Sequence, residues 1–171
     1  MTNLTIATMS KAIYGKDAKD LRVTAIEHTP QGARAALESF YYAFNQKSLS
    51  VFEAVWAPDP LIQLNNPLGG VQRGYIPIRE LYRRIFEGPA HVWVEFSDIV
   101  EYLDNNIAVF AGKENGEFSL DDVTVTLAIR TTRIFKYLGK DLGWRQIHHH
   151  GSIDDAALLK QYQEAVKGKS N

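Results

Sequence analysis

The chain has 171 residues and a mass of 19.3 kDa, which suits one compact domain. Nineteen basic residues face twenty acidic ones, so we expect no partner that binds mainly through phosphates, such as DNA or RNA. The absence of cysteine excludes disulfides, thiolate metal ligands and a cysteine nucleophile.

The first 28 residues are the least patterned part of the sequence. No basic stretch precedes an apolar run there, so we expect no secretory signal, and no later apolar segment is long enough to span a membrane. We therefore predict a cytoplasmic protein without a membrane partner. Residues 1–28 would form a weakly ordered or helical arm, and residues 29–168 would form the domain.

Helical patterns dominate the first half of this domain. Pro30 is a typical first helical residue after a capping threonine, and apolar residues then recur at helical spacing up to Phe44. A capping box that begins at Ser50 predicts a second, shorter helix, and a third helix is expected to end at Gly88. A short strand at residues 61–65 lies between the second and third helices.

The second half of the domain has the alternating pattern of long β-strands. Residues 92–99 alternate with one phase shift, which predicts a β-bulge near Ser97. The next strand is expected to end, or to enter a longer loop, at Asn115 and Gly116. The remaining predicted elements are a strand at 123–135, a strand at 144–152 and a helix at 154–166.

Helices that precede a run of antiparallel strands predict an α+β fold, in which a curved antiparallel sheet wraps around N-terminal helices. A bent sheet closed by helices encloses a conical cavity, which is a usual place for a small ligand. The sequence contains neither a phosphate-binding loop nor a dinucleotide fingerprint, so we expect no cofactor.

The C-terminal strands carry a family signal. Residues 132–135 read TRIF, and residues 143–152 read GWRQIHHHGS. These segments, joined by a turn, resemble the SnoaL-like branch of the nuclear transport factor 2-like superfamily, with similarity over about residues 30–155. The resemblance implies a cone-shaped domain that forms a homodimer through the outer face of its sheet. It implies no single activity, because this fold hosts enzymes, binding proteins and oligomerisation domains.

The association domain of calcium/calmodulin-dependent kinase offers a parallel within this superfamily. Arginines line its pocket; one corresponds to Arg133 here, while two others fall on Ala111 and Gly151. The resemblance therefore implies a single pocket arginine in this chain. The catalytic carboxylates of ketosteroid isomerase have no counterpart at matching positions, so the resemblance does not imply isomerase activity.

Strand alternation sorts the candidate residues by face. In the strand from residue 123, odd positions are apolar, which predicts that Thr131 and Arg133 face the helices and the cavity. In the last strand, Ile147 marks the inner face and predicts that Arg145 and His149 lie inside. The alternation then predicts four residues on the outer face, where we expect the homodimer interface: Trp144, Gln146, His148 and His150.

Arg133 is the most conspicuous candidate, because a buried guanidinium is costly unless it is paired. It would either form an internal salt bridge, for example with a glutamate of a helix, or anchor a carboxylate or enolate-like oxygen of a ligand. His149 would be a general base or hydrogen-bond donor beside it, or else a core residue. We take Arg133 and His149 as the catalytic candidates.

The ligand-binding candidates are residues that would line the cavity, although each also has a structural explanation. Tyr41 and Trp56 would be either core residues or a shelf for the ligand, and Arg145 would lie inside or at the rim. The full ligand-binding set is Tyr41, Trp56, Thr131 and Arg145.

No metal site is expected, because His148 and His150 share a strand face without a visible third ligand. The sequence predicts a protein that binds a small, mostly apolar molecule in a conical pocket, with or without acid–base activity of an isomerase, cyclase or hydrolase kind. The alternative is a non-catalytic homodimerisation module.

Overall fold

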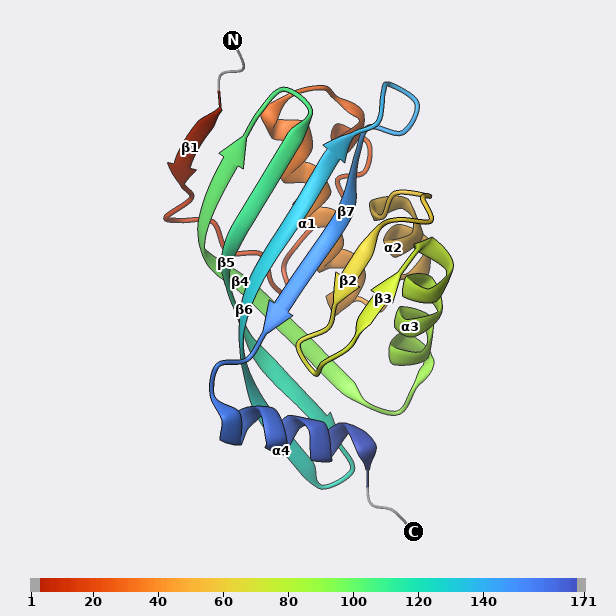
Figure 1. Cartoon of the computed structure of the whole chain (residues 1–171), viewed down its shortest axis with the longest axis vertical. Coiled ribbons are helices and arrows are strands. Elements are labelled where there is room, and N and C mark those ends of the chain that lie inside the picture. Colours follow the sequence, from red (N-terminus) through yellow and green to blue (C-terminus); the bar gives the residue numbers. More distant parts are fainter. Residues whose placement is uncertain (1–3, 169–171) are drawn as a thin grey trace.

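The computed structural model describes residues 4–168 and confirms the predicted α+β class (Figure 1). Its single seven-stranded sheet has the strand order β1-β4-β5-β6-β7-β2-β3. The strands are β1 (Thr5–Thr8), β2 (Gln63–Asn65), β3 (Val71–Arg73), β4 (His91–Leu103), β5 (Ile107–Leu120), β6 (Val123–Tyr137) and β7 (Trp144–Ser152). The helices are α1 (Pro30–Asn45), α2 (Leu49–Val55), α3 (Tyr75–Glu87) and α4 (Ala156–Lys167), with a 3-10 turn at Thr24–Ile26.

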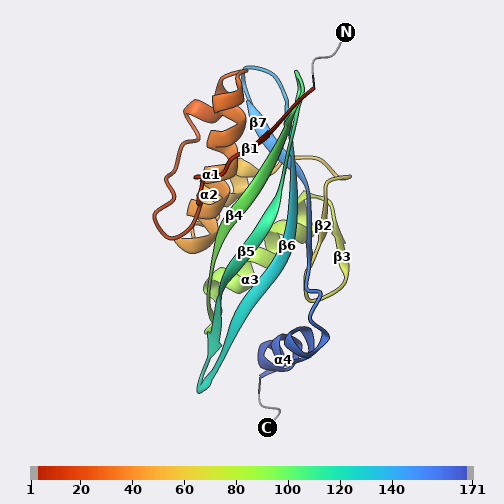
Figure 2. The ribbon, with the colours of Figure 1, turned by 90° about the vertical axis from the view of Figure 1, so that its left-hand side faces the viewer.

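The helices cover the sheet at different heights. Figure 2 shows α1 and α2 along one face of the long strands, and α4 beside the far end of β5 and β6. Aromatic side chains fill the space between helices and sheet, and each contributes about 1.5–3 kcal/mol through its burial. The fully buried ones are Phe40, Tyr41, Phe52, Trp56, Phe96, Phe110 and Phe135. Among residues 4–168, no helix is both long enough and apolar enough to cross a lipid bilayer.

The first two helices begin at hydroxyl caps, as their sequences suggest. The Thr29 side chain accepts the Gly32 N–H at 3.0 Å, so α1 begins at Pro30 as predicted. The cap of α2 is Ser48, which accepts the Val51 N–H, so the capping box predicted at Ser50 is wrong by two residues. The helix itself is present in the predicted place.

β4 and β5 are longer and more irregular than an ideal hairpin. Their register shifts between Ser97 and Val100, which confirms the predicted bulge. β5 runs through Asn115 and Gly116 to Leu120, so the strand end or loop predicted there is wrong. A Cβ on Gly116 would lie 2.0 Å from the carbonyl oxygen of Trp93, so this glycine permits close approach of β4 rather than a turn.

A second bulge changes the faces of β7. Ile134 pairs with His148, whereas Phe135 pairs with Gln146, so Ile147 is an extra residue in the strand. Alternation reverses at this residue, and Trp144 and Gln146 point inward with exposed fractions of 3% and 0%. The prediction that these two residues lie on the outer face is therefore wrong. Trp144 cannot contribute to a homodimer interface there.

The same bulge moves Arg145 away from its predicted place. Arg145 pairs with the exposed Lys136, so it does not share the inner face with His149. His149 is inward and 4% exposed, as predicted, because it follows the bulge. The single register shift thus separates two residues that the sequence places on one face.

The N-terminal arm is ordered over its described part. β1 pairs with β4 at the edge of the sheet, and Tyr14 bridges to Phe96. The Leu21 N–H donates to Ser39 Oγ at 2.9 Å, and the Trp144 indole donates to the Glu27 carbonyl at 3.0 Å. The predicted weakly ordered or helical arm is corrected: it contains a strand and a short 3-10 turn, although residues 1–3 lie outside the described residues.

Candidate functional site

A cavity of about 390 Å³ lies between α3, α4 and the inner face of the sheet. This volume is at the lower end of small-molecule pockets, which are roughly 300–1,000 Å³. Its walls are mostly aliphatic and aromatic; three polar side chains lie together at one end, and Asn66 and Arg84 line the cavity as well. The walls include Leu81, Ile85, Val94, Phe118, Leu127, Ile129 and Tyr162, and the polar end comprises Glu114, Arg133 and His149.

Arg133 and Glu114 form a buried ion pair at this end. They are 2% and 3% exposed, and Arg133 Nη2 donates to Glu114 Oε1 at 2.8 Å. Arg133 also donates through Nε to the Tyr41 hydroxyl at 2.9 Å and through Nη1 to Gln146 Oε1 at 3.1 Å. The guanidinium stacks over the Phe40 ring, 3.6 Å from its centroid. The guanidinium is therefore fixed on every edge by protein groups.

Tyr41 links the two charged groups. Its hydroxyl accepts from Arg133 and donates to Glu114 Oε1 at 2.6 Å, and burial raises its pKa well above the ordinary value. Burial by itself would lower the pKa of Arg133, but Tyr41 and Glu114 raise it above its usual range, so the guanidinium stays charged. Both hydrogen bonds to Glu114 fall on Oε1, and Oε2 receives none from residues 4–168.

His149 lies directly across from Arg133 in the β6–β7 ladder and lines the cavity. Neither ring nitrogen has a hydrogen-bond partner within residues 4–168, although the side chain is buried. Burial, followed by the positive charge of Arg133, lowers the pKa of His149 well below its ordinary value. The imidazole is therefore neutral near pH 7 and presents one donor and one acceptor.

This pKa shift predicts an acid-sensitive fold. The unfolded chain takes up a proton at His149 near the ordinary pKa of 6.5, whereas the folded chain does not, so stability falls as pH falls. Between pH 7 and pH 5 the free energy of unfolding should therefore fall, and His149 contributes to that fall. Urea titrations at both pH values should show a smaller loss for His149→Leu than for His150→Leu, an exposed control. Equal losses in the two variants would contradict the shift.

The structure brings only part of the predicted residue set to the cavity. Arg133 and His149 line it, and Tyr41 lies behind them in contact with Arg133. Trp56 and Thr131 are buried, but they are not among the residues that line the cavity. Arg145 lies instead at a second pocket beside the N-terminal arm.

Two polar residues of the site escape the sequence reasoning. Glu114 precedes the Asn115-Gly116 pair that reads as a turn, and Gln146 precedes the bulge that reverses its face. The salt-bridge alternative for Arg133 is what the structure shows, with a glutamate of strand β5 rather than of a helix. Alternation carried through Gly116 would have placed Glu114 inside, because Phe118 and Phe110 share its parity.

Within residues 4–168, no three histidine, cysteine, aspartate or glutamate side chains gather as a group that could hold a metal ion. Glu114 and His149 alone provide too few ligands for the tetrahedral or octahedral sites usual in proteins.

Solved structures share the fold. The chain is 27% identical to a proposed calcium/calmodulin-dependent protein kinase type II association domain from Thiobacillus denitrificans, over 72% of this chain and 94% of that one, with a TM-score of 0.55. An LEH-like epoxide hydrolase from M. tuberculosis is 16% identical, over 86% and 92% of the two chains, with a TM-score of 0.56. A proposed dehydratase of the NTF2-like family from Streptomyces avermitilis is 19% identical, over 68% and 89%, with a TM-score of 0.61. No curated protein matches the chain.

A family model matches most of the chain. It describes a SnoaL-like domain and covers residues 33–156, from the first turn of α1 to the start of α4. The match includes the strands that carry Glu114, Arg133 and His149. The solved structures of similar fold include NTF2-like proteins, in agreement with the curved sheet and its helices. The chain belongs to the SnoaL-like domain family.

Proposed function

We propose that this protein binds a neutral, largely apolar organic molecule in the cavity, with a hydroxyl or carbonyl oxygen of that molecule hydrogen-bonded to His149. The observation that carries the proposal is the buried imidazole whose two nitrogens have no partner within residues 4–168. An unpaired buried polar group costs about 1–3 kcal/mol, and a ligand oxygen in the cavity would remove that cost.

Charge balance at the polar end favours a neutral group there. The carboxylate of Glu114 matches the guanidinium of Arg133, and the neutral His149 adds no charge. The remaining charged residue of the lining is Arg84 on α3. A ligand carboxylate would have to compete with Glu114, Tyr41 and Gln146 for the same guanidinium. The proposal of a neutral ligand at His149 therefore differs from the sequence-based prediction, in which Arg133 anchors a carboxylate or an enolate-like oxygen.

The walls set the remaining character of the ligand. They consist mostly of apolar side chains from α3, β5, β6 and α4, with Asn66 and Arg84 as the polar exceptions, so the part of the molecule away from His149 is largely apolar. A cavity of about 390 Å³ suits a compact molecule of one or two rings better than a long chain. Burial of its apolar surface would supply most of the affinity, and the hydrogen bond would orient it.

Acid–base chemistry has a better candidate in Glu114 than in His149. The lowered pKa makes His149 a weaker base than free imidazole. Glu114 lines the cavity with a carboxylate oxygen, Oε2, that accepts no hydrogen bond from residues 4–168, while Oε1 holds Arg133 and Tyr41. In this proposal Glu114 Oε2 takes a proton from the carbon next to the ligand carbonyl, and the electron pair of the broken C–H bond moves onto the carbonyl oxygen, which the His149 N–H stabilises. Arg133 holds the Glu114 carboxylate in place.

A matched pair of ligands tests the binding proposal. Camphor and its parent hydrocarbon bornane differ by one carbonyl oxygen, and both are compact. Camphor should bind His149→Leu about 2–10-fold more weakly than the control His150→Leu, measured by calorimetry, because one neutral hydrogen bond is lost. Bornane should bind both variants equally or should prefer His149→Leu.

Two outcomes would contradict the proposal. One is equal camphor affinity in the two histidine variants. The other is failure of the wild-type protein to bind any member of a panel of cyclic ketones and alcohols. Either result would favour the alternative function, a non-catalytic association module, which is supported by the 27% identity to a proposed association domain.

A further inference from the structure

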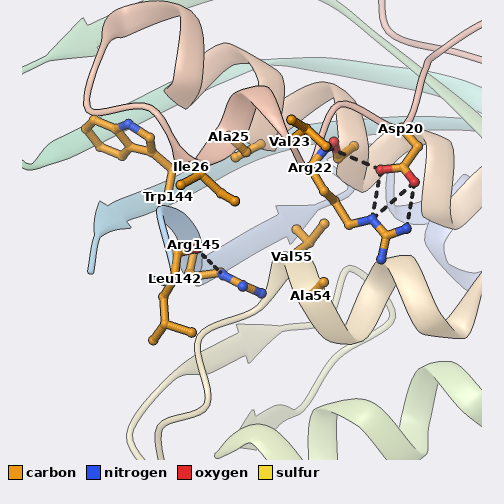
Figure 3. Close-up of a pocket in the computed structure, with 12 residues that line it drawn as sticks. Asp20, Arg22, Val23, Ala25, Ile26, Ala54, Val55, Leu142, Trp144 and Arg145 are labelled. Atoms are coloured by element: carbon orange, nitrogen blue, oxygen red, sulfur yellow. Dashed lines mark hydrogen bonds and ion pairs between the residues drawn. The ribbon is translucent and has the colours of Figure 1, made fainter. Parts of the chain in front are cut away.

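A second pocket, of about 310 Å³, lies beside the N-terminal arm and shares no lining residue with the cavity (Figure 3). Arm residues form one wall, α1 and α2 form the floor, and the start of β7 with the preceding turn forms the opposite wall. The arm contributes Asp20, Arg22, Val23, Ala25 and Ile26. These residues precede the family match at 33–156, so the family domain alone does not make this pocket.

Specific contacts hold the arm in place. The Lys19 N–H donates to Glu38 Oε1 at 3.0 Å, and the Leu21 N–H donates to Ser39 Oγ at 2.9 Å. The backbone at Ala25 lies so close to Gly143 that a Cβ there would be 2.3 Å from the Ala25 oxygen. These contacts fix the arm against the domain, so the pocket between them is part of the folded structure.

Arg145 is the one charged group in this pocket that lacks a charged partner. Its Nε donates to the Leu142 carbonyl at 2.8 Å, and its two terminal nitrogens have no hydrogen-bond or ion-pair partner within residues 4–168. Figure 3 shows its guanidinium pointing into the pocket. Across the pocket, Arg22 is held by Asp20 at 2.8 Å, so that pair contributes little net charge.

We propose that this pocket binds a small organic carboxylate, with the carboxylate on the terminal nitrogens of Arg145 and the apolar body against Val23, Ile26 and Val55. A guanidinium presents two parallel N–H groups that match the two oxygens of a carboxylate. Half-burial of Arg145 lowers its pKa, as expected for a guanidinium without a counterion, and a bound carboxylate would supply one.

The apolar walls restrict the ligand further. Val23, Ile26, Val55, Leu142 and Trp144 surround the guanidinium, so an inorganic anion would leave most of the pocket unfilled. The small volume favours a single ring or a short chain. Benzoate and hexanoate fit this description and differ in the shape of the apolar part.

Titration of benzoate and hexanoate, followed by protein NMR, tests the proposal. At least one should bind the wild-type protein and shift the amides of Ala25, Ile26 and Leu142. Arg145→Gln should weaken that binding about 10–100-fold, because a charge-assisted hydrogen-bond pair is lost. The matched control is Arg130→Gln, which removes an exposed arginine from β6 and should leave the affinity unchanged.

Benzyl alcohol has the same ring as benzoate but no charge. Its affinity should be the same in Arg145→Gln and Arg130→Gln, because it makes no ion pair with Arg145. His149→Leu should leave carboxylate binding unchanged, so failure here and failure of the camphor experiment are distinguishable. The proposal is overturned if neither carboxylate binds, if Arg145→Gln binds as the wild type does, or if the shifts map to Glu114 and His149 instead.

Discussion

Replacement of Arg133 by methionine is expected to lower the free energy of unfolding by about 3–5 kcal/mol. The substitution preserves most of the aliphatic volume but leaves the Glu114 carboxylate buried with Tyr41 as its remaining partner. It also removes the stacking on Phe40 and the donor to Gln146. Urea denaturation with an unchanged m-value would attribute the loss to the native state.

The control and a second variant identify the cause. Arg130→Met removes an exposed arginine three residues earlier in β6 and should change stability by less than about 0.5 kcal/mol. The double variant Arg133→Met with Glu114→Gln should recover a large part of the loss, because no unpaired charge remains in the core. If Arg133→Met were as stable as Arg130→Met, the Arg133–Glu114 ion pair would not stabilise the fold.

Replacement of Gly143 by alanine is expected to cost about 2–4 kcal/mol and to loosen the N-terminal arm. Gly143 has a φ of +68°, which L-residues rarely adopt, and a Cβ there would lie 2.3 Å from the Ala25 oxygen. The arm must move away to accept it. Hydrogen exchange should therefore accelerate at the Ala25 amide, which donates to Leu21 in the native arm.

Gly139 provides the matched control in the same turn. Its φ is +92°, but a Cβ there would meet no atom within 4 Å. Gly139→Ala should therefore carry the backbone cost alone, about 1–2 kcal/mol, without faster exchange in the arm. If both variants lost the same stability and left the arm equally protected, the close approach at Gly143 would have no energetic role.

Local sequence patterns predict most of the fold because they reflect one-sided burial. The odd residues from Val125 to Phe135 are all buried, so the faces of β6 follow from alternation alone. The bulge near Ser97 shows as a break in the same pattern. Asn115 and Gly116 mislead because their turn preference is a local property, whereas pairing on both sides with β4 and β6 keeps them extended.

The site depends on features that no local pattern encodes. The bulge at Ile147 lies among polar and aromatic residues without a glycine or proline to mark it, and it decides the faces of Gln146 and Arg145. The partner of Arg133 is Glu114, 19 residues away on a neighbouring strand, and only tertiary pairing selects it. Sequence reasoning can therefore identify the buried arginine and histidine but cannot identify what surrounds them.

The boundaries of the family match have an evolutionary consequence. The polar end of the cavity lies within residues 33–156, but Tyr162 and Val166, which close its wall, belong to the part of α4 beyond the match. Under the proposed function, a relative with the same Glu114, Arg133 and His149 but a different C-terminal helix would have a differently shaped cavity. Transfer of a function between relatives by alignment of the polar residues alone would miss that difference, because part of the cavity wall lies outside the matched domain.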